Sequence, residues 1–317
     1  MKNILITSAG RRVSLVQTFK QTASKYNDEI KIYTADKDPV LAPACYVSDG
    51  SFKVSSVKDD CYIDELLEIC ESKNVGIVIP TIDTCLPVLS RNVQRFIESG
   101  IHVMVSCQDF VGISCDKRET FKFFREYGIK FPKAIDISNP TFPIFAKPID
   151  GSGSIGIHVI NNEEELSENI KHDSNLLFME YVDKAEYKEF TIDMYFGKDN
   201  HVKCIVPRER IEVRGGEVSK GVTRRNYLVD FLRKRFEFMP GVVGCICIQL
   251  FYRENDNDVL GIEINPRFGG GYPLSYHAGA NFPQMIMQEY IQGKPLKYTD
   301  NWQDNRLMLR YDAEIIL

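Results

Sequence analysis

The chain has 317 residues, of which 44% are hydrophobic and 26% are charged, values typical of a globular protein with two or three domains. A net charge of −5 gives no reason to expect a nucleic-acid partner, because a nucleic-acid surface usually needs a concentrated basic face. The nine cysteines include no C-x-x-C pair, so we expect reduced residues and no disulfide framework or zinc site. The N-terminus enters a strand pattern directly, without a signal peptide, and no apolar run approaches the ~18 residues of a membrane span. These features predict a cytoplasmic protein without a membrane partner.

The first hundred or so residues alternate short apolar strands with amphipathic helices. We expect strands at residues 3–7, 30–35, 75–80 and 102–105, and helices at residues 13–26, 62–73 and 86–99. Strands and helices that alternate at these lengths predict a parallel sheet covered on both faces. The segment 36–39 follows the second strand at its C-terminal end, where open α/β sheets bind ligands.

A second unit of mixed helices and strands begins near Ser114. Its first part is expected to contain a helix at residues 116–127, strands at 143–147, 157–160 and 176–182, a glycine-rich turn at 150–156, and a short helix at 163–170. Strands at 189–196 and 202–206, a polar glycine-containing loop at 214–221 and a helix at 227–238 follow. The chain then continues with strands at 245–253 and 259–265, a glycine loop at 269–271 and a helix at 283–292. The predicted fold class is α/β followed by α+β units.

The strongest functional signal is the expected hairpin near the C-terminus. If residues 259–265 fold back on residues 245–253, Gln249 lies opposite Glu263. Because residues two apart in a strand share a face, Glu263, Asn265 and Arg267 project from one side. Oxygen ligands suit Mg²⁺, and an arginine fork suits phosphoryl oxygens. A lone E-x-N would indicate an edge hairpin with a solvated polar face, but the Asn-Pro-Arg continuation and Gln249 favour a functional site.

Lys147 ends a buried strand and stands just before the glycine-rich turn Asp150-Gly151-Ser152-Gly153-Ser154-Ile155-Gly156. Backbone N–H groups of glycines can approach an anion closely, so a lysine followed by such a turn suits a polyphosphate. A purely structural hairpin turn fits the same pattern.

Weaker signals lie elsewhere in the second unit. Lys117 follows Asp116, a candidate N-cap at the start of a helix. The free backbone N–H groups at a helix start favour anions. Carboxylates at strand ends can accept ribose hydroxyls, and the candidates are Glu180, Glu189 and Asp193. Six cations within eighteen residues form either a solvated face or a loop that presents charge to an acidic substrate: Arg208, Arg210, Arg214, Lys220, Arg224 and Arg225. There is no P-loop, residues 8–12 lack the G-x-G-x-x-G spacing of a dinucleotide site, and the five histidines show no metal spacing.

Taken in order, these motifs resemble the ATP-grasp superfamily, and in particular one synthetase half of the carbamoyl phosphate synthase large subunit. The resemblance implies three parts. Residues 1–112 would form a pre-ATP-grasp, Rossmann-like domain. Residues 113–183 would form a small lobe that carries the glycine-rich flap, and residues 184–317 a large lobe with the metal and phosphate site.

The resemblance also implies residue roles. Lys117 and Lys147 would bind the ATP phosphates under a flap that contains Gly151, Ser152, Gly153 and Ser154. The backbone of Tyr181 and Val182 would hold adenine, with Glu180 and Glu189 near adenine and ribose. Gln249, Glu263 and Asn265 would be ligands of Mg²⁺, with Mn²⁺ as the alternative ion. Arg267 would act with Lys147 as a catalytic group on the transferring phosphoryl.

The function expected from this resemblance is an ATP- and Mg²⁺-dependent ligase that activates a carboxylate as an acyl phosphate for attack by an amine. One alternative is an enzyme like carbamoyl phosphate synthase, which would phosphorylate bicarbonate or carbamate. That synthetase carries two such halves and this chain carries one, which favours the carboxylate–amine ligase. Further alternatives are a non-catalytic ATP-binding regulatory protein and a dehydrogenase with a dinucleotide site near residues 8–12. The expected partners are small-molecule acids and amines, or bicarbonate and ammonia, and a second copy of the chain in a homodimer.

Overall fold

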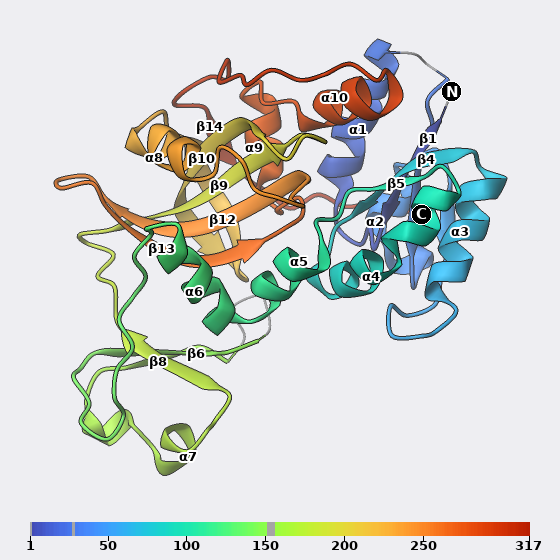
Figure 1. Ribbon diagram of the computed structural model, residues 1–317. Coiled ribbons are helices and arrows are strands. Elements are labelled where there is room, and N and C mark those ends of the chain that lie inside the picture. The colour runs from blue at the N-terminus through green and yellow to red at the C-terminus, as the bar shows by residue number, and fades with distance from the viewer. Residues whose placement is uncertain (1, 27–28, 151–155) are drawn as a thin grey trace.

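The structure is a computed structural model that describes residues 2–26, 29–150 and 156–317. Its strands form a five-stranded, a three-stranded and a six-stranded sheet (Figure 1). The five-stranded sheet is parallel and the other two sheets are antiparallel, so the predicted fold class of an α/β unit followed by α+β units is confirmed. The division into three domains, with boundaries after residues 112 and 183, stays a prediction.

The N-terminal sheet has the strand order β3-β2-β1-β4-β5. Its strands are β1 (Asn3–Thr7), β2 (Ile32–Asp36), β3 (Ser51–Lys53), β4 (Val75–Pro80) and β5 (His102–Val103). Ile4 and Ile6 pack in one core cluster with α1 (Val13–Tyr26), whereas Leu5 packs in another with α3 (Tyr62–Ser72) and α4 (Leu86–Glu98). Successive residues of a strand point to opposite faces, so helices cover both faces of this sheet. The short α2 (Pro43–Tyr46) and the 3₁₀ turns η1 (Pro39–Leu41) and η2 (Asp83–Cys85) follow strand ends.

The three-stranded sheet forms the small unit at the bottom of Figure 1. It comprises β7 (His158–Ile160), β6 (Ile144–Pro148) and β8 (Leu176–Glu180), in that order. The prediction of one helix over residues 163–170 is wrong, because η3 (Glu163–Glu165) and α7 (Glu168–Lys171) are separate. Ser167 accepts the N–H of Ile170 and starts the second helix as its N-cap, which breaks the continuity.

The six-stranded sheet has the order β13-β12-β9-β10-β11-β14. Its strands are β9 (Lys188–Phe196), β10 (Val202–Arg214), β11 (Glu217–Thr223), β12 (Gly244–Arg253), β13 (Asp258–Asn265) and β14 (Leu307–Leu309). One core cluster joins this sheet to α6 (Lys117–Glu126) and α8 (Tyr227–Arg235). Another cluster joins it to α1 of the N-terminal unit through α9 (Tyr272–His277) and α10 (Phe282–Ile286), with the rings of Phe19 and Phe268 5.7 Å apart. This shared core fixes the C-terminal edge of the parallel sheet against the large sheet.

The predicted loop at residues 214–221 is wrong, because the segment is a hairpin. β10 continues through Arg214, and Arg214 pairs directly with Glu217 at the start of β11. Gly215 and Gly216 form the turn with φ of 57° and 78°, the positive values that a tight hairpin turn requires. Proline is uncommon in inner strands, so Pro207 led us to predict that this strand ends at residue 206.

The C-terminal helix and several short elements also differ from the prediction. The helix expected at residues 283–292 consists of α10 followed by the π-helical η4 (Met287–Ile291). The sequence patterns gave no indication of α5 (Gln108–Cys115), α9 or β14. Across the described parts of the chain, no helix is long and apolar enough to cross a membrane.

Candidate active site

The hairpin of β12 and β13 has the predicted register, with Gln249 opposite Glu263. Gln249 Nε2 donates to Glu263 Oε1 over 2.7 Å, and Asn265 Nδ2 donates to the same oxygen over 3.0 Å. One carboxylate oxygen therefore accepts hydrogen bonds from both amides, and the three side chains form a single half-buried cluster.

This cluster fits a magnesium ion that brings further ligands with it. It offers one carboxylate and two amide oxygens, and Mg²⁺ in proteins is commonly bound by one or two carboxylates together with phosphates and water. In the described part of the chain, no three His, Cys, Asp or Glu side chains converge as a metal site, so nothing there resembles a closed zinc centre. To use their oxygens as ligands, the two amides must turn away from Glu263.

Lys147, in β6, approaches the hairpin from the small unit. Its side chain is buried, with Nζ 3.3 Å from the carbonyl oxygen of Ile262 and 5.0 Å from the ring centroid of Phe121. Burial lowers the pKa of Lys147 to about 8, although the nearby carboxylate of Glu263 opposes the shift. An anionic ligand beside this ammonium would replace the water that it lacks.

Lys117 begins α6, and its Nζ lies 3.5 Å from the carbonyl oxygen of Ile149, just after β6. Burial lowers the pKa of Lys117, and the charge of Lys117 in turn helps to lower that of Lys147. The two lysines and Glu263 therefore share one electrostatic environment. The predicted N-cap is confirmed, because the Asp116 side chain accepts the N–H of Arg118 over 2.8 Å.

Arg267 follows β13 and joins the hairpin to the N-terminal sheet. Its Nη2 donates to Asp83 Oδ2 over 2.7 Å and to Asn265 Oδ1 over 3.2 Å. The side chain is only 13% exposed, and burial alone would lower its pKa, but the charge and hydrogen bond of Asp83 raise it overall. Because Asp83 follows β4, the hairpin meets the carboxyl edge of the parallel sheet, where open α/β sheets bind ligands.

Four charged residues at this edge were missed in the sequence. Arg12 Nη2 donates to the carbonyl oxygen of Thr81 over 3.3 Å, and its Nη1 lies 3.9 Å from Glu217. Glu217 pairs more closely with Arg310, at 2.7 Å. Arg12 and Asp83 could have been singled out by their positions after β1 and β4. Glu217 lies in the segment that was wrongly expected to be a loop, and Arg310 follows β14, which was not predicted.

The other predicted nucleotide residues lie along β8 and β9. Glu180 accepts the N–H of Lys133 over 3.0 Å, and Tyr181 donates its N–H to the carbonyl oxygen of Pro143 over 3.4 Å. Val182 is buried. Glu189 forms an ion pair with Arg210 at 2.8 Å. Glu189 lies in β9, two residues before Thr191, and Thr191 pairs with Gln249 of β12. Of the predicted flap, Gly151, Ser152, Gly153 and Ser154 lie outside the described residues.

Contrary to the expectation from the sequence, Asp193 is not available to accept a ribose hydroxyl. It is fully buried and accepts Arg208 Nε over 2.7 Å, Ser275 Oγ over 2.6 Å and Cys247 Sγ over 3.0 Å. The carboxylate therefore links β9 to β10, β12 and α9 in the core.

Of the two interpretations left open for the six cations, the loop that presents charge to an acidic substrate is not what the structure shows. Because the segment forms two strands, each cation meets an acidic partner across the sheet or on a neighbouring segment. The ion pairs are Arg208–Asp193, Arg210–Glu189, Arg214–Asp312, Lys220–Glu212, Arg224–Glu209 and Arg225–Asp300.

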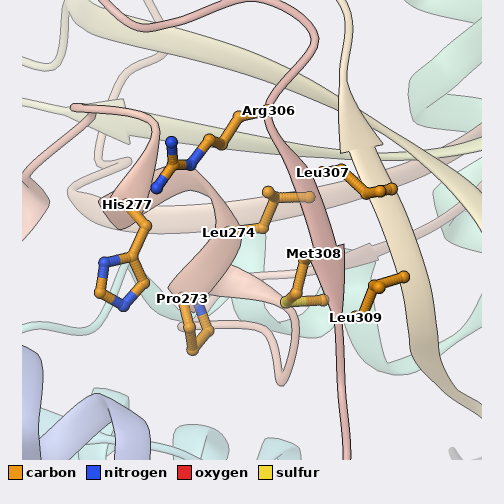
Figure 2. A pocket seen from close by; sticks show the side chains of 7 residues that line it. All are labelled: Pro273, Leu274, His277, Arg306, Leu307, Met308 and Leu309. Atoms are coloured by element: carbon orange, nitrogen blue, oxygen red, sulfur yellow. The ribbon is translucent and has the colours of Figure 1, made fainter.

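A separate surface cavity of about 350 Å³ lies between α9 and β14 (Figure 2). Its lining consists of Pro273, Leu274, His277, Arg306, Leu307, Met308 and Leu309. None of these residues belongs to the hairpin cluster, so the cavity is distinct from the candidate site.

Two family models match this chain. The model described as the ATP-grasp domain matches residues 114–271, and the model of the PylC-like N-terminal domain matches residues 4–104. The chain belongs to the ATP-grasp superfamily. This confirms the family expected from the sequence, whereas the particular likeness to a carbamoyl phosphate synthase half stays a prediction.

A curated relative of this ATP-grasp protein is the 3-methyl-D-ornithine–L-lysine ligase of Methanosarcina acetivorans. It is 30% identical over 170 residues, which are 53% of this chain and 42% of the relative. The match thus spans less than half of the relative's length.

Solved structures share the fold at low sequence identity. N5-carboxyaminoimidazole synthetase from Staphylococcus aureus, complexed with ADP, has a TM-score of 0.71 and 17% identity over 94% of this chain and 79% of its own. The biotin carboxylase domain dimer of 2-oxoglutarate carboxylase from Hydrogenobacter thermophilus, in complex with MgADP and bicarbonate, has a TM-score of 0.70 and 15% identity over 96% and 72%. The L-amino acid ligase of Bacillus licheniformis has a TM-score of 0.68 and 16% identity over 94% and 75%.

Proposed function

We propose that this ATP-grasp protein is an ATP- and Mg²⁺-dependent ligase that activates a carboxylate as an acyl phosphate and joins it to an amine. The observation that carries the proposal is the cluster of Glu263, Gln249 and Asn265 beside Arg267, with the buried Lys147 facing it from the small unit. The combination supplies oxygen ligands for a hard cation together with fixed positive charge for phosphates.

Each predicted residue has a role in this proposal. Lys117 and Lys147 bind nucleotide phosphates, Gln249, Glu263 and Asn265 hold Mg²⁺ or Mn²⁺, and Arg267 contacts the transferring phosphoryl group. Gly151, Ser152, Gly153 and Ser154 lie outside the described residues, and the role proposed for them is the flap that the resemblance implies. The adenosine lies along Glu180, Tyr181, Val182 and Glu189. Magnesium ATP, when bound, supplies the phosphoryl group, and the cationic side chains neutralise the charge that gathers on its oxygens.

The reaction balances without a further reactant. A carboxylate oxygen forms a bond to the γ-phosphorus, and the bond from that phosphorus to the β,γ-bridging oxygen breaks with its electron pair left on ADP. The amine nitrogen then bonds to the acyl carbon, the carbon–oxygen bond to phosphate breaks, and the amine proton leaves with hydrogen phosphate. The positively charged side chains favour the first step, and exclusion of water protects the acyl phosphate before the second.

Amino acids are the first substrates to test. The matched part of the curated relative belongs to a ligase named for 3-methyl-D-ornithine and L-lysine, and a structural neighbour is an L-amino acid ligase. Phosphorylation of bicarbonate is the second candidate, because a neighbour of the same fold was solved with MgADP and bicarbonate. That neighbour is a dimer of its domain, and a homodimer is part of our proposal, to be measured by light scattering.

The experiment is a screen for ADP release with pooled acids and pooled amines, including D-ornithine, L-lysine, bicarbonate and ammonia. We expect one acid and amine pool to raise ADP release well above the rate with ATP alone, and bicarbonate alone to do so if the second candidate is correct. Failure of every pool, in a protein that also does not bind MgADP, would refute the proposal. MgADP binding without any turnover would instead favour the regulatory protein.

A further inference from the structure

Two guanidinium groups from different sheets meet at the carboxyl edge of the parallel sheet. Arg12, after β1, donates to the carbonyl oxygen of Thr81, and Arg267, after β13, donates to Asp83. Thr81 and Asp83 are two residues apart in the segment after β4, so both guanidinium groups are bound to the same short segment, one through a backbone carbonyl and the other through a side chain. Burial and the nearby charge of Arg267 lower the pKa of Arg12, as expected for like charges held close together.

The charges at this junction do not balance. In the ion pairs of this junction within the described residues, three guanidinium groups (Arg12, Arg267 and Arg310) meet two carboxylates, Asp83 and Glu217. The carboxylate of Glu263 also lies near Arg267, but it is shared with Lys117 and Lys147. Glu217 lies 2.7 Å from Arg310 but 3.9 Å from Arg12, and Asp83 is bound by Arg267. Arg12 is therefore the cation with the weakest carboxylate partner.

Arg12 and Arg267 also have N–H donors that are not used in hydrogen bonds among the described residues. A guanidinium group has five N–H donors. Within the described ranges, the guanidinium group of Arg12 donates one hydrogen bond, to the backbone carbonyl of Thr81. The Nε of Arg267 is buried and finds no acceptor among the described residues. Buried donors without acceptors are costly, so this junction favours an anion that accepts from both arginines.

We propose that Arg12 and Arg267 together bind the carboxylate of the acid substrate, the group that becomes the acyl phosphate. The inference rests on the proposed function, in which Arg267 contacts the transferring phosphoryl group. The attacking oxygen must lie about 3–3.5 Å from the phosphorus, which requires the acid to sit next to Arg267. Arg12 lies on that side, and its planar fork matches a carboxylate. The acid therefore binds between the end of β1 and the β10–β11 hairpin, where Glu217 and Arg310 hold the hairpin in place.

Binding measured by calorimetry tests this inference without turnover. Each of the common L-amino acids and D-ornithine is titrated into the full chain saturated with the non-hydrolysable Mg²⁺–AMP-PNP. The diamines 1,4-diaminobutane and 1,5-diaminopentane, which are ornithine and lysine without the carboxylate, serve as matched ligands. The variants are Arg12→Gln, Arg12→Lys and Arg11→Gln. Arg11 is exposed and adjacent, so its change removes the same charge without removing the proposed contact.

We expect at least one acid to bind the wild type more tightly than its diamine. Arg12→Gln should weaken that acid about 10- to 100-fold, Arg12→Lys should weaken it less, and Arg11→Gln should stay within about threefold. MgADP affinity, measured in every variant, should not change, which shows that the nucleotide site is intact.

Equal acid affinity in Arg12→Gln and the wild type would overturn the inference. So would a wild type that binds MgADP but no acid of the panel, and in both cases the nucleotide part of the proposed function would stand. A wild type that does not bind MgADP would refute the proposed function itself, and the inference with it.

Discussion

At the scale of single residues, Lys147 is the most unusual charge in the protein. The residue is only 5% exposed, and no carboxylate forms a direct ion pair with its ammonium group among the described residues. Burial lowers its pKa to about 8 from the usual 10.5. Between these values the unfolded chain binds more protons than the folded one, so the cost of the buried charge is present below about pH 8 and is relieved as the pH rises toward 10.5.

The same shift makes nucleotide binding depend on pH. If the charged form of Lys147 binds phosphate, MgADP affinity should fall as the pH rises through about 8. In Lys147→Arg the guanidinium keeps its charge, so the affinity should stay nearly constant over the same range. Calorimetric titrations from pH 6.5 to about pH 9.5 measure this. A wild-type profile as flat as that of Lys147→Arg would show that Lys147 does not contact the phosphates.

Glu263 is the only carboxylate in the hairpin cluster formed with Gln249 and Asn265. Glu263→Gln keeps the shape and removes the charge, and we expect it to cost on the order of 3 kcal/mol of transition-state stabilisation. The measurement is Mg²⁺-dependent ADP release, compared with Glu254→Gln on the exposed turn of the same hairpin. Equal rates in the two variants would contradict the assignment of Glu263 to the metal.

At the scale of elements, α6 packs closely on β13 and holds the small unit near the hairpin. A Cβ added to Gly261 would lie 2.4 Å from the Phe124 ring, which is fully buried and has little room to move. We expect Gly261→Ala to destabilise the protein by about 1–3 kcal/mol through overpacking.

The matched control is Gly112→Ala in α5. No heavy atom lies within 4 Å of its added Cβ, and alanine favours a helix, so stability should be unchanged or rise by up to about 1 kcal/mol. Chemical denaturation measures both variants. If Gly261→Ala were as stable as Gly112→Ala, the close packing of α6 on β13 would be in doubt.

The ion pair between β9 and β10 is the second element-scale test. Asp193 and Arg208 are both buried, and Asp193→Asn would leave the guanidinium without its carboxylate. We expect a loss of about 3–5 kcal/mol. Asp64→Asn, which breaks the exposed pair with Arg95, should cost at most about 1 kcal/mol. A small loss in Asp193→Asn, similar to that of Asp64→Asn, would show that the buried pair does not support the sheet.

Local pattern was enough to predict elements whose signals are continuous. The strands Asn3–Thr7 and Val75–Pro80, the helix Val13–Tyr26 and the pairing of Gln249 with Glu263 are as expected. The β10–β11 hairpin was not predicted, because Pro207 and the two glycines of its turn are usual signs of a strand end and a loop. The sequence therefore left open whether the cations of that segment form a solvated face or a substrate-binding loop, whereas the structure pairs them with acidic residues.

At the scale of the whole molecule, the site depends on how three sheets meet. Lys147 comes from the small sheet, Glu263 from the large sheet, and Asp83 and Arg12 from the edge of the parallel sheet. The sequence predicted the first two because each belongs to a motif. It could not predict that Arg12 would lie near Glu217, since that contact exists only after the core around Phe19 and Phe268 has joined the units.

The most direct test of the central claim is a crystal structure of the protein with Mg²⁺ and AMP-PNP. The account predicts an ion about 2.0–2.1 Å from a carboxylate oxygen of Glu263, with the amide oxygens of Gln249 and Asn265 turned toward it. Lys147 Nζ should lie about 3 Å from a phosphate oxygen. A nucleotide bound elsewhere, with Glu263 still accepting hydrogen bonds from both amides, would contradict it.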